Sequence, residues 1–125
     1  MYGSGKPLRQ FLFCNDFARF IIEVLYEYND TKTLICCNEE EITIEELIRK
    51  IAKIYQFKGE IIKDTSKEDG CYKKTVDYKQ CKELFPDFKF TNIDDGLALT
   101  INWFILHYHV TNKVNPIVSN DVIRM

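Results

Sequence analysis

The stretch TIEELIRKIAKIY, residues 43–55, carries the clearest structural signal in the chain. Thr43 is followed three residues later by Glu46, a spacing that lets each side chain bond the backbone of the other at a helix start. Ile42 and Leu47 flank this cap with the spacing of a hydrophobic staple. Apolar residues then recur at the intervals of one helix face: Leu47, Ile48, Ile51, Ala52, Ile54 and Tyr55. The stretch predicts an amphipathic helix that ends before Gly59.

Shorter signals extend on both sides of this helix. Three runs predict strands: Arg9–Phe13, Leu34–Cys37 and Glu60–Lys63. Three further helices are predicted from caps and apolar spacing: one capped by Asn15 or Asp16 and ending near Tyr28, one capped by Asp77 and ending at Leu84, and one capped by Thr91 with Asp94 and ending near Tyr108. Such alternation is typical of an α/β domain, here a small mixed sheet of short strands covered by helices. We expect this domain over residues 1–112 and a tail over residues 113–125.

Composition excludes several classes of protein. The chain has 125 residues and 46% hydrophobic residues, which suits a single globular domain. A formal charge of -2 disfavours a protein that coats nucleic acid. No apolar run approaches the ~18 residues of a membrane span, and the first ten residues lack the apolar core of a signal peptide. Five cysteines without a C-x-x-C pair predict free thiols in a reducing compartment such as the cytoplasm.

The candidate binding motifs have both plain and functional interpretations. Gly3-Ser4-Gly5-Lys6 is followed by Pro7 and fits a flexible loop better than a phosphate loop. Arg9 is either a surface arginine or a clamp for a diphosphate, because its guanidinium matches two phosphate oxygens. Asp69-Gly70 is either a tight turn or an acceptor for the hydroxyls of a ribose. A G-x-G-x-x-G dinucleotide motif is absent.

No catalytic or metal-binding constellation is visible in the sequence. His107 and His109 fall on different faces of their predicted helix, which is poor geometry for a shared metal ion. No cysteine has an obvious histidine partner, so a cysteine nucleophile is not predicted. From composition and spacing alone, the chain is an α/β module that could bind an anionic, hydroxylated ligand.

Four segments carry a resemblance to a known family. They are Tyr-Gly-Ser-Gly-x-Pro-x-Arg from Tyr2 to Arg9 with Phe11-Leu12 and Asp16, Asp64-Thr-Ser-Lys-x-Asp-Gly-x-x-Lys-Lys74, Leu84-x-Pro-Asp-Phe-x-Phe-Thr91, and Trp103-Phe104. Their order and spacing resemble the carboxyl-terminal part of GDP-L-fucose synthase, of the extended short-chain dehydrogenase/reductase superfamily. The resemblance implies the carboxyl-terminal substrate domain of that fold without its Rossmann domain.

The resemblance also implies a function for the full-length enzyme. Such enzymes convert GDP-4-keto-6-deoxy-D-mannose to GDP-L-fucose by 3,5-epimerisation and NADPH-dependent 4-reduction, in the cytoplasm and as homodimers. By matching motif, Tyr2 packs on the GDP-sugar, Arg9 grips its diphosphate and Asp69 contacts its nucleotide. The catalytic residues and the NADP(H) site lie upstream in the family, so this chain should have neither and should be inactive alone. The alternatives are the same domain of another sugar-nucleotide epimerase or dehydratase, or a non-catalytic binding module.

Overall fold

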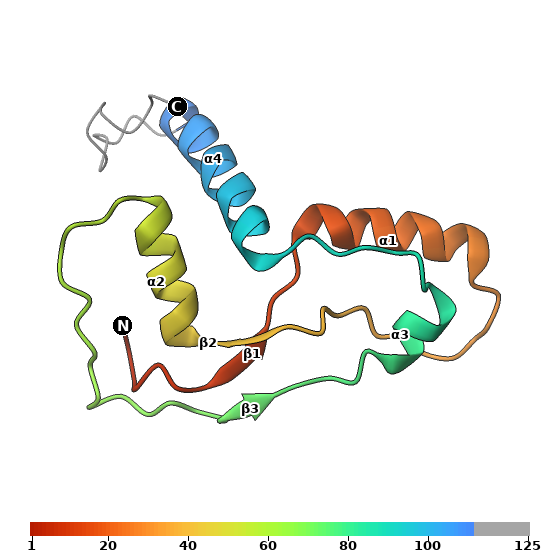
Figure 1. Cartoon of the computed structure of the whole chain (residues 1–125), viewed down its shortest axis with the longest axis horizontal. Helices are drawn as coiled ribbons and strands as arrows, with labels where there is room; N and C mark the ends of the chain where they lie inside the picture. The colour runs from red at the N-terminus through yellow and green to blue at the C-terminus, as the bar shows by residue number, and fades with distance from the viewer. Residues whose placement is uncertain (112–125) are drawn as a thin grey trace.

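The computed structural model describes residues 1–111 and shows an elongated molecule with helices at both ends. One end holds α2 and α4, the other holds α1 and α3, and three short strands connect them (Figure 1). In chain order the elements are β1 (Leu8–Gln10), α1 (Cys14–Glu27), β2 (Glu41–Thr43), α2 (Ile44–Ile54), β3 (Lys73–Lys74), α3 (Lys79–Leu84) and α4 (Ile93–Thr111). The predicted tail, residues 113–125, lies outside the described residues.

The three strands form a small mixed sheet, as predicted, with the order β2-β1-β3. β1 runs antiparallel to β2, where Arg9 lies opposite Ile42, and parallel to β3, where Arg9 lies opposite Lys74. The central strand is shorter than the predicted Arg9–Phe13, because it ends at Gln10. Arg9 therefore occupies the middle of the sheet, with a paired strand on each side.

Two predicted strands are wrong. The segment Leu34–Cys37 is not a strand, because Leu34 and Cys36 pack on an aromatic cluster instead of pairing with the sheet. The segment Glu60–Lys63 is not a strand either. The amino group of Met1 donates to the carbonyl of Ile62 at 2.8 Å, and an isolated bridge joins Tyr2 to Asp64, but this pairing does not extend into a strand. A short apolar run in the sequence does not by itself distinguish a strand from a loop that packs on the core.

The helix α2 begins as the capping pattern predicts. The backbone N–H of Glu46 donates to Thr43 Oγ1 at 3.1 Å, and the N–H of Thr43 donates to Glu46 Oε2 at 2.7 Å. Both ends of this reciprocal pair satisfy backbone groups that a helix start leaves free. α3 begins at Lys79 with Tyr78 in the cap position, one residue later than a cap by Asp77 would place it, although Asp77 Oδ1 still accepts from the N–H of Lys79 at 2.8 Å.

The caps of α1 and α4 differ from the prediction. α1 begins at Cys14, with Phe13 in the cap position, and Asp16 is buried in its first turn. The cap of α4 is Asn92, whose Oδ1 accepts from the N–H of Asp95 at 2.9 Å. Thr91 is one residue too early, because its N–H and hydroxyl are both bonded to Asp16. Asp16 and Thr91 were each predicted to cap a helix, but they bond each other instead.

A cluster of buried aromatic residues joins α1 to the end of α3. Phe20 and Phe85 are 2% and 7% exposed and meet edge to face, with ring centroids 5.0 Å apart. Phe88 and Phe90 extend this cluster, and Phe88 lies 5.1 Å from Phe20. Edge-to-face pairs add to the stabilisation that burial of each ring gives. At the other end, Lys50 of α2 pairs with Asp94 of α4 at 2.7 Å.

Within residues 1–111, no helix has the length and apolar character needed to cross a membrane.

Candidate substrate-binding site

The glycine-rich loop before β1 has a conformation that its two glycines make possible. Gly3 and Gly5 have φ angles of 74° and 77°, in the left-handed region that residues with a Cβ rarely adopt. A Cβ on Gly3 would lie 2.3 Å from Asp69 Oδ1. Glycine at position 3 thus lets the loop approach a carboxylate that is far away in the sequence.

Asp69 binds this loop through both of its carboxylate oxygens. Oδ1 accepts from the backbone N–H of Ser4 and Oδ2 accepts from the Ser4 hydroxyl, each at 2.5 Å. The hydroxyl and backbone of Ser4 together hold the pKa of Asp69 below its usual range, and the charge of Lys6 lowers this pKa further. The predicted turn is present as well, since Gly70 has a φ of 67°. Asp69 is therefore a charged acceptor that is already engaged by the loop.

Arg9 is held by carbonyl oxygens and not by acids. Its Nη1 donates to the carbonyl of Leu8 at 2.6 Å, and its Nη2 donates to the carbonyl of Cys71 at 2.9 Å. Among residues 1–111, no carboxylate forms an ion pair with this guanidinium. The positive charge of Arg9 is thus positioned without being neutralised, which suits the binding of an anion.

Tyr2 presents its ring to solvent. The side chain is 79% exposed, while the neighbouring backbone is fixed by two hydrogen bonds. The N–H of Gly3 donates to the carbonyl of Asp64 at 2.9 Å, and the N–H of Asp64 donates to the carbonyl of Met1 at 2.8 Å. An exposed aromatic ring on a fixed backbone can stack on a flat or apolar surface of a ligand.

The structure brings the three residues carried over from the resemblance into one region. Tyr2 adjoins Gly3, Asp69 binds Ser4, and Cys71, two residues beyond Asp69, binds Arg9. Ser4 was not identified from the sequence as a hydrogen-bond partner of Asp69, because the two residues are 65 positions apart. The positive charge of Lys73, which follows this segment, is paired with Glu41 at 3.0 Å.

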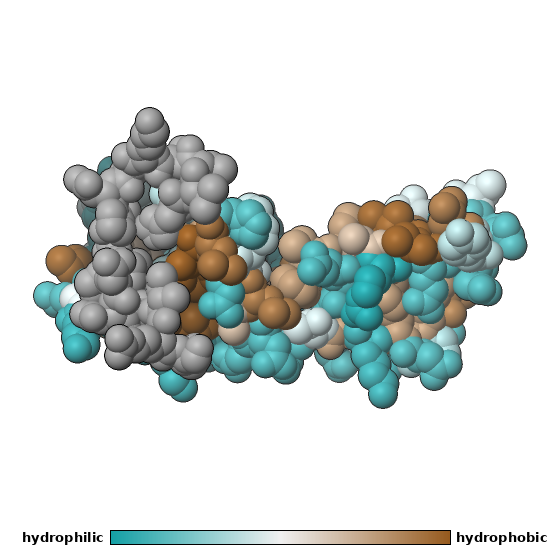
Figure 2. Space-filling view, turned by 90° about the horizontal axis from the view of Figure 1, so that it is seen from above, coloured by the Kyte–Doolittle hydropathy of each residue, from teal (hydrophilic) through white to brown (hydrophobic). Residues whose placement is uncertain are grey.

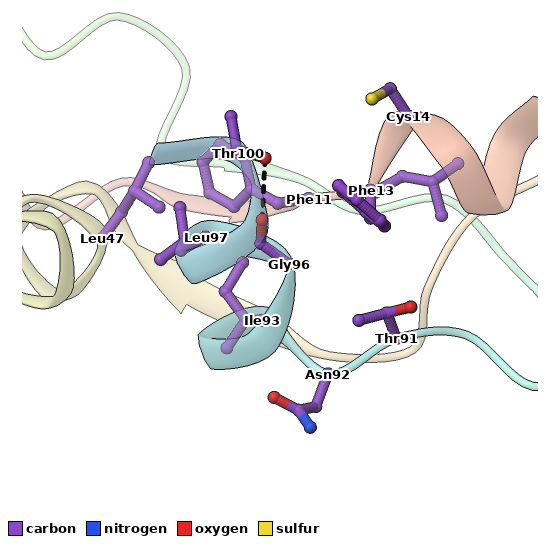
Figure 3. Close-up of a pocket in the computed structure, with 11 residues that line it drawn as sticks. Phe11, Phe13, Cys14, Leu47, Thr91, Asn92, Ile93, Gly96, Leu97 and Thr100 are labelled. Carbon is purple, nitrogen blue, oxygen red and sulfur yellow. Dashed lines mark hydrogen bonds between the residues drawn. The ribbon is translucent and has the colours of Figure 1, made fainter. Parts of the chain in front are cut away.

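A separate cavity lies away from this region. Its volume is about 240 Å³, and it is bounded by the starts of α1 and α4 and by Leu47 of α2 (Figure 3). The lining is mainly apolar: Phe11, Leu12, Phe13, Cys14, Leu47, Thr91, Asn92, Ile93, Gly96, Leu97 and Thr100. Tyr2, Arg9 and Asp69 are not among these residues. No cavity was predicted from the sequence at this place.

The three cysteines that are buried or partly buried are weak nucleophiles. All five lie within the described residues and are free thiols, as predicted. Burial and the neighbouring Cys81 raise the pKa of Cys36 to about 12, and burial also raises the pKa of Cys37 and of Cys81. A thiol with a raised pKa is a weak nucleophile at neutral pH. Within residues 1–111, no three side chains of His, Cys, Asp or Glu are placed to hold a metal ion.

The chain is similar to several curated proteins. It is 36% identical to a probable GDP-L-fucose synthase of Drosophila melanogaster over 115 residues, which is 90% of this chain and 36% of that protein. It is 41% identical to a GDP-L-fucose synthase of Dictyostelium discoideum over 113 residues, which is 89% of this chain and 35% of that protein. No family model matches the chain.

Solved structures share the fold. A GDP-L-fucose synthetase of Naegleria fowleri bound to NADP superposes with a TM-score of 0.84 and 35% identity, over 87% of this chain and 35% of that one. A UDP-glucose 4-epimerase of Thermotoga maritima superposes with a TM-score of 0.76, over 86% of this chain and 35% of that one. Its identity is 19%, so it supports the fold alone. The resemblance to the GDP-L-fucose synthases is thus confirmed over about nine tenths of this chain, which spans about a third of the length of those relatives.

Proposed function

We propose that this chain is the carboxyl-terminal, substrate-binding part of a GDP-L-fucose synthase. The whole enzyme would convert GDP-4-keto-6-deoxy-D-mannose to GDP-L-fucose by epimerisation at C3 and C5 and reduction at C4. The observation that carries the proposal is that the 69–71 segment bonds the glycine-rich loop through Asp69 and bonds Arg9 through Cys71, in a chain 36–41% identical to proteins of that name. A homodimeric, cytoplasmic enzyme remains a prediction from the resemblance.

The three site residues would bind different parts of the GDP-sugar. Arg9 would bind the diphosphate, since its charge is not neutralised by a carboxylate in residues 1–111 and its guanidinium offers paired donors. The exposed ring of Tyr2 would pack on the ligand beside it. Asp69, whose pKa the bonds from Ser4 hold below its usual range, would accept hydrogen bonds from the nucleotide.

The residues present do not fit NADP(H). A dinucleotide is held by a glycine-rich loop that leads into the N-terminus of a helix, where free N–H groups meet the phosphates. Here the loop leads into the strand β1, and the N–H of Ser4 is already bonded to Asp69. We therefore place the cofactor and the chemical steps in parts of the enzyme that this chain does not span, and we expect no turnover of NADPH by this chain alone.

The test is a calorimetric titration of GDP into the 125-residue chain and into Arg9→Ala. The wild type should bind GDP, and Arg9→Ala should bind it about 30- to 150-fold more weakly, because a bidentate charged contact is lost. Arg49→Ala is the matched control, since Arg49 is an exposed arginine that pairs with Glu45 at 2.8 Å. Equal affinity of the wild type and Arg9→Ala would refute the diphosphate role.

A second titration separates the proposal from its main alternative. UDP has the same diphosphate but a different base, so a GDP-L-fucose synthase part should prefer GDP. Equal or tighter binding of UDP would favour another sugar-nucleotide enzyme, consistent with the fold it shares with a UDP-glucose 4-epimerase. Absence of binding to either nucleotide would contradict the proposed substrate site in this chain.

A further inference from the structure

Two segments far apart in sequence are joined along their length around the proposed site. Ser4 bonds Asp69, the N–H of Leu8 donates to the carbonyl of Tyr72 at 2.8 Å, and Arg9 bonds the carbonyl of Cys71. Three residues of the 4–9 segment therefore bond three residues of the 69–72 segment, at Ser4, Leu8 and Arg9. The contact between Ser4 and Asp69 joins two side chains, whereas Leu8 and Arg9 both bond backbone carbonyls, those of Tyr72 and Cys71.

The hydroxyl of Ser4 lies at the centre of the first contact. It donates to Asp69 Oδ2 at 2.5 Å and accepts from the backbone N–H of Lys6 at 3.1 Å. The backbone N–H of Ser4 donates to the other carboxylate oxygen. Both oxygens of Asp69 are thus occupied by one residue, and the same hydroxyl fixes the backbone three residues before Arg9.

The opposite side of the loop is fixed by α2. The N–H of Glu45 donates to the carbonyl of Gly5 at 2.9 Å, and the N–H of Ile44 donates to the carbonyl of Pro7 at 3.1 Å. These N–H groups belong to the first turn of the helix, where no partner within the helix exists. The Ser4–Asp69 contact ties the start of the loop to the 69–72 segment, and the bond between Leu8 and Tyr72 ties its end.

We propose that Ser4 is a positioning residue for the diphosphate-binding Arg9, acting through its contact with Asp69. The inference rests on the proposed function, because it assumes that Arg9 binds a nucleotide diphosphate. It assigns to Asp69 a role in ordering the loop in addition to any contact with the ligand. Removal of the Ser4 hydroxyl should loosen the loop and lower affinity for the diphosphate, although Ser4 need not touch it.

The first measurement needs no ligand. Hydrogen exchange of the Ser4 and Lys6 amides, followed by NMR in the 125-residue chain, should be about 5- to 20-fold faster in Ser4→Ala than in wild type. Ser4→Thr keeps the hydroxyl and should restore slow exchange. Ser66→Ala is the matched control, since Ser66 also donates to an aspartate, Asp64, at 2.5 Å but is outside the loop. Unchanged exchange in Ser4→Ala would overturn the inference even if GDP binds.

The second measurement is a double-mutant cycle for GDP binding. Ser4→Ala should weaken binding about 5- to 20-fold, Ser4→Thr should recover it, and Ser66→Ala should leave it unchanged. In the Arg9→Ala background the effect of Ser4→Ala should shrink toward zero, because Ser4 acts through Arg9. An undiminished effect in that background would overturn the positioning role. If the wild type binds no GDP, the proposed function fails, and with it the role in diphosphate binding, whereas the exchange rates still decide whether Ser4 orders the loop.

Discussion

The carboxylate of Asp16 accepts hydrogen bonds from both the backbone N–H and the hydroxyl of Thr91, a residue 75 positions further along the chain, at 2.6 Å and 3.0 Å. Asp16 is 1% exposed, and Arg19 completes its set of donors at 2.6 Å. The contact joins the start of α1 to the segment that leads into α4. It therefore sets the relative position of two helices whose first turns border the apolar cavity.

Removal of the Asp16 carboxylate should destabilise the fold. Asp16→Ala leaves the N–H of Thr91 without its acceptor, and hydrogen bonds to charged groups contribute about 1.5–3 kcal/mol. We expect the free energy of unfolding to fall by about 2–3 kcal/mol in urea titrations. Asp16→Asn keeps one acceptor oxygen and should lose less, whereas Asp87→Ala, at an exposed position, should stay within about 0.5 kcal/mol of wild type. Equal stability of Asp16→Ala and wild type would contradict this prediction.

The same carboxylate should make stability depend on pH in the acid range. Burial raises the pKa of Asp16, but hydrogen bonds from Thr91 and Arg19 outweigh burial, and the net pKa lies below its usual value. A group with a lowered folded pKa stabilises the fold above its unfolded pKa of about 3.9, and this stabilisation is lost as pH falls through the folded pKa. The free energy of unfolding should thus fall below about pH 4. The measure is the difference between wild type and Asp16→Asn across a pH series, which should narrow on acidification; a constant difference would count against it.

Sequence patterns whose residues are close together predicted the α2 cap correctly. The wrong caps of α1 and α4 arise where a residue bonds a partner that is distant in the sequence. Thr43 and Glu46 are three residues apart, so the sequence alone contains the whole capping interaction. Asp16 and Ser4 have partners 75 and 65 residues away, and no local pattern reveals which carboxylate meets which loop. Thr91 is an example of such an error. Its spacing to Asp94 predicts a helix cap, but its N–H and hydroxyl donate to Asp16. Arg9 and Asp69 were candidates from the residues as well as from the resemblance, whereas Tyr2 came from the resemblance alone, and only the fold shows that the 2–9 and 64–72 segments bond one another.

The cap of α2 offers a test of a correctly predicted feature. Thr43→Ala removes the acceptor for the N–H of Glu46, and loss of such a cap costs about 1 kcal/mol. Thr43→Ser keeps the hydroxyl and should stay close to wild type. The free energy of unfolding from urea titrations distinguishes the two variants. If both lose the same stability, the methyl group of Thr43 and not its hydrogen bond is responsible.

The solvent-exposed face of α1 is more apolar than that of a typical surface helix. Figure 2 shows hydrophobic residues gathered over this helix, at the right of the view. Five of its large hydrophobic side chains are at least 46% exposed: Phe17, Ile21, Ile22, Leu25 and Tyr26. Exposed apolar patches of several hundred Å² usually mark an interaction surface. These five side chains therefore form an apolar face on α1 that residues 1–111 leave exposed.

The isolated chain should therefore associate with itself through α1. Leu25 is 77% exposed, so Leu25→Lys removes apolar surface and adds charge without disturbing the buried Phe20 on the other side of the helix. In sedimentation experiments the average mass of the wild type should rise with concentration, and Leu25→Lys should suppress that rise while the urea midpoint stays the same. Leu106→Lys on α4 is the matched control, because Leu106 is 63% exposed but belongs to another helix. A wild type that stays monomeric at all concentrations and binds no apolar dye would show that this face is not an open interface. Equal suppression by Leu106→Lys would place the association on a broader surface than α1.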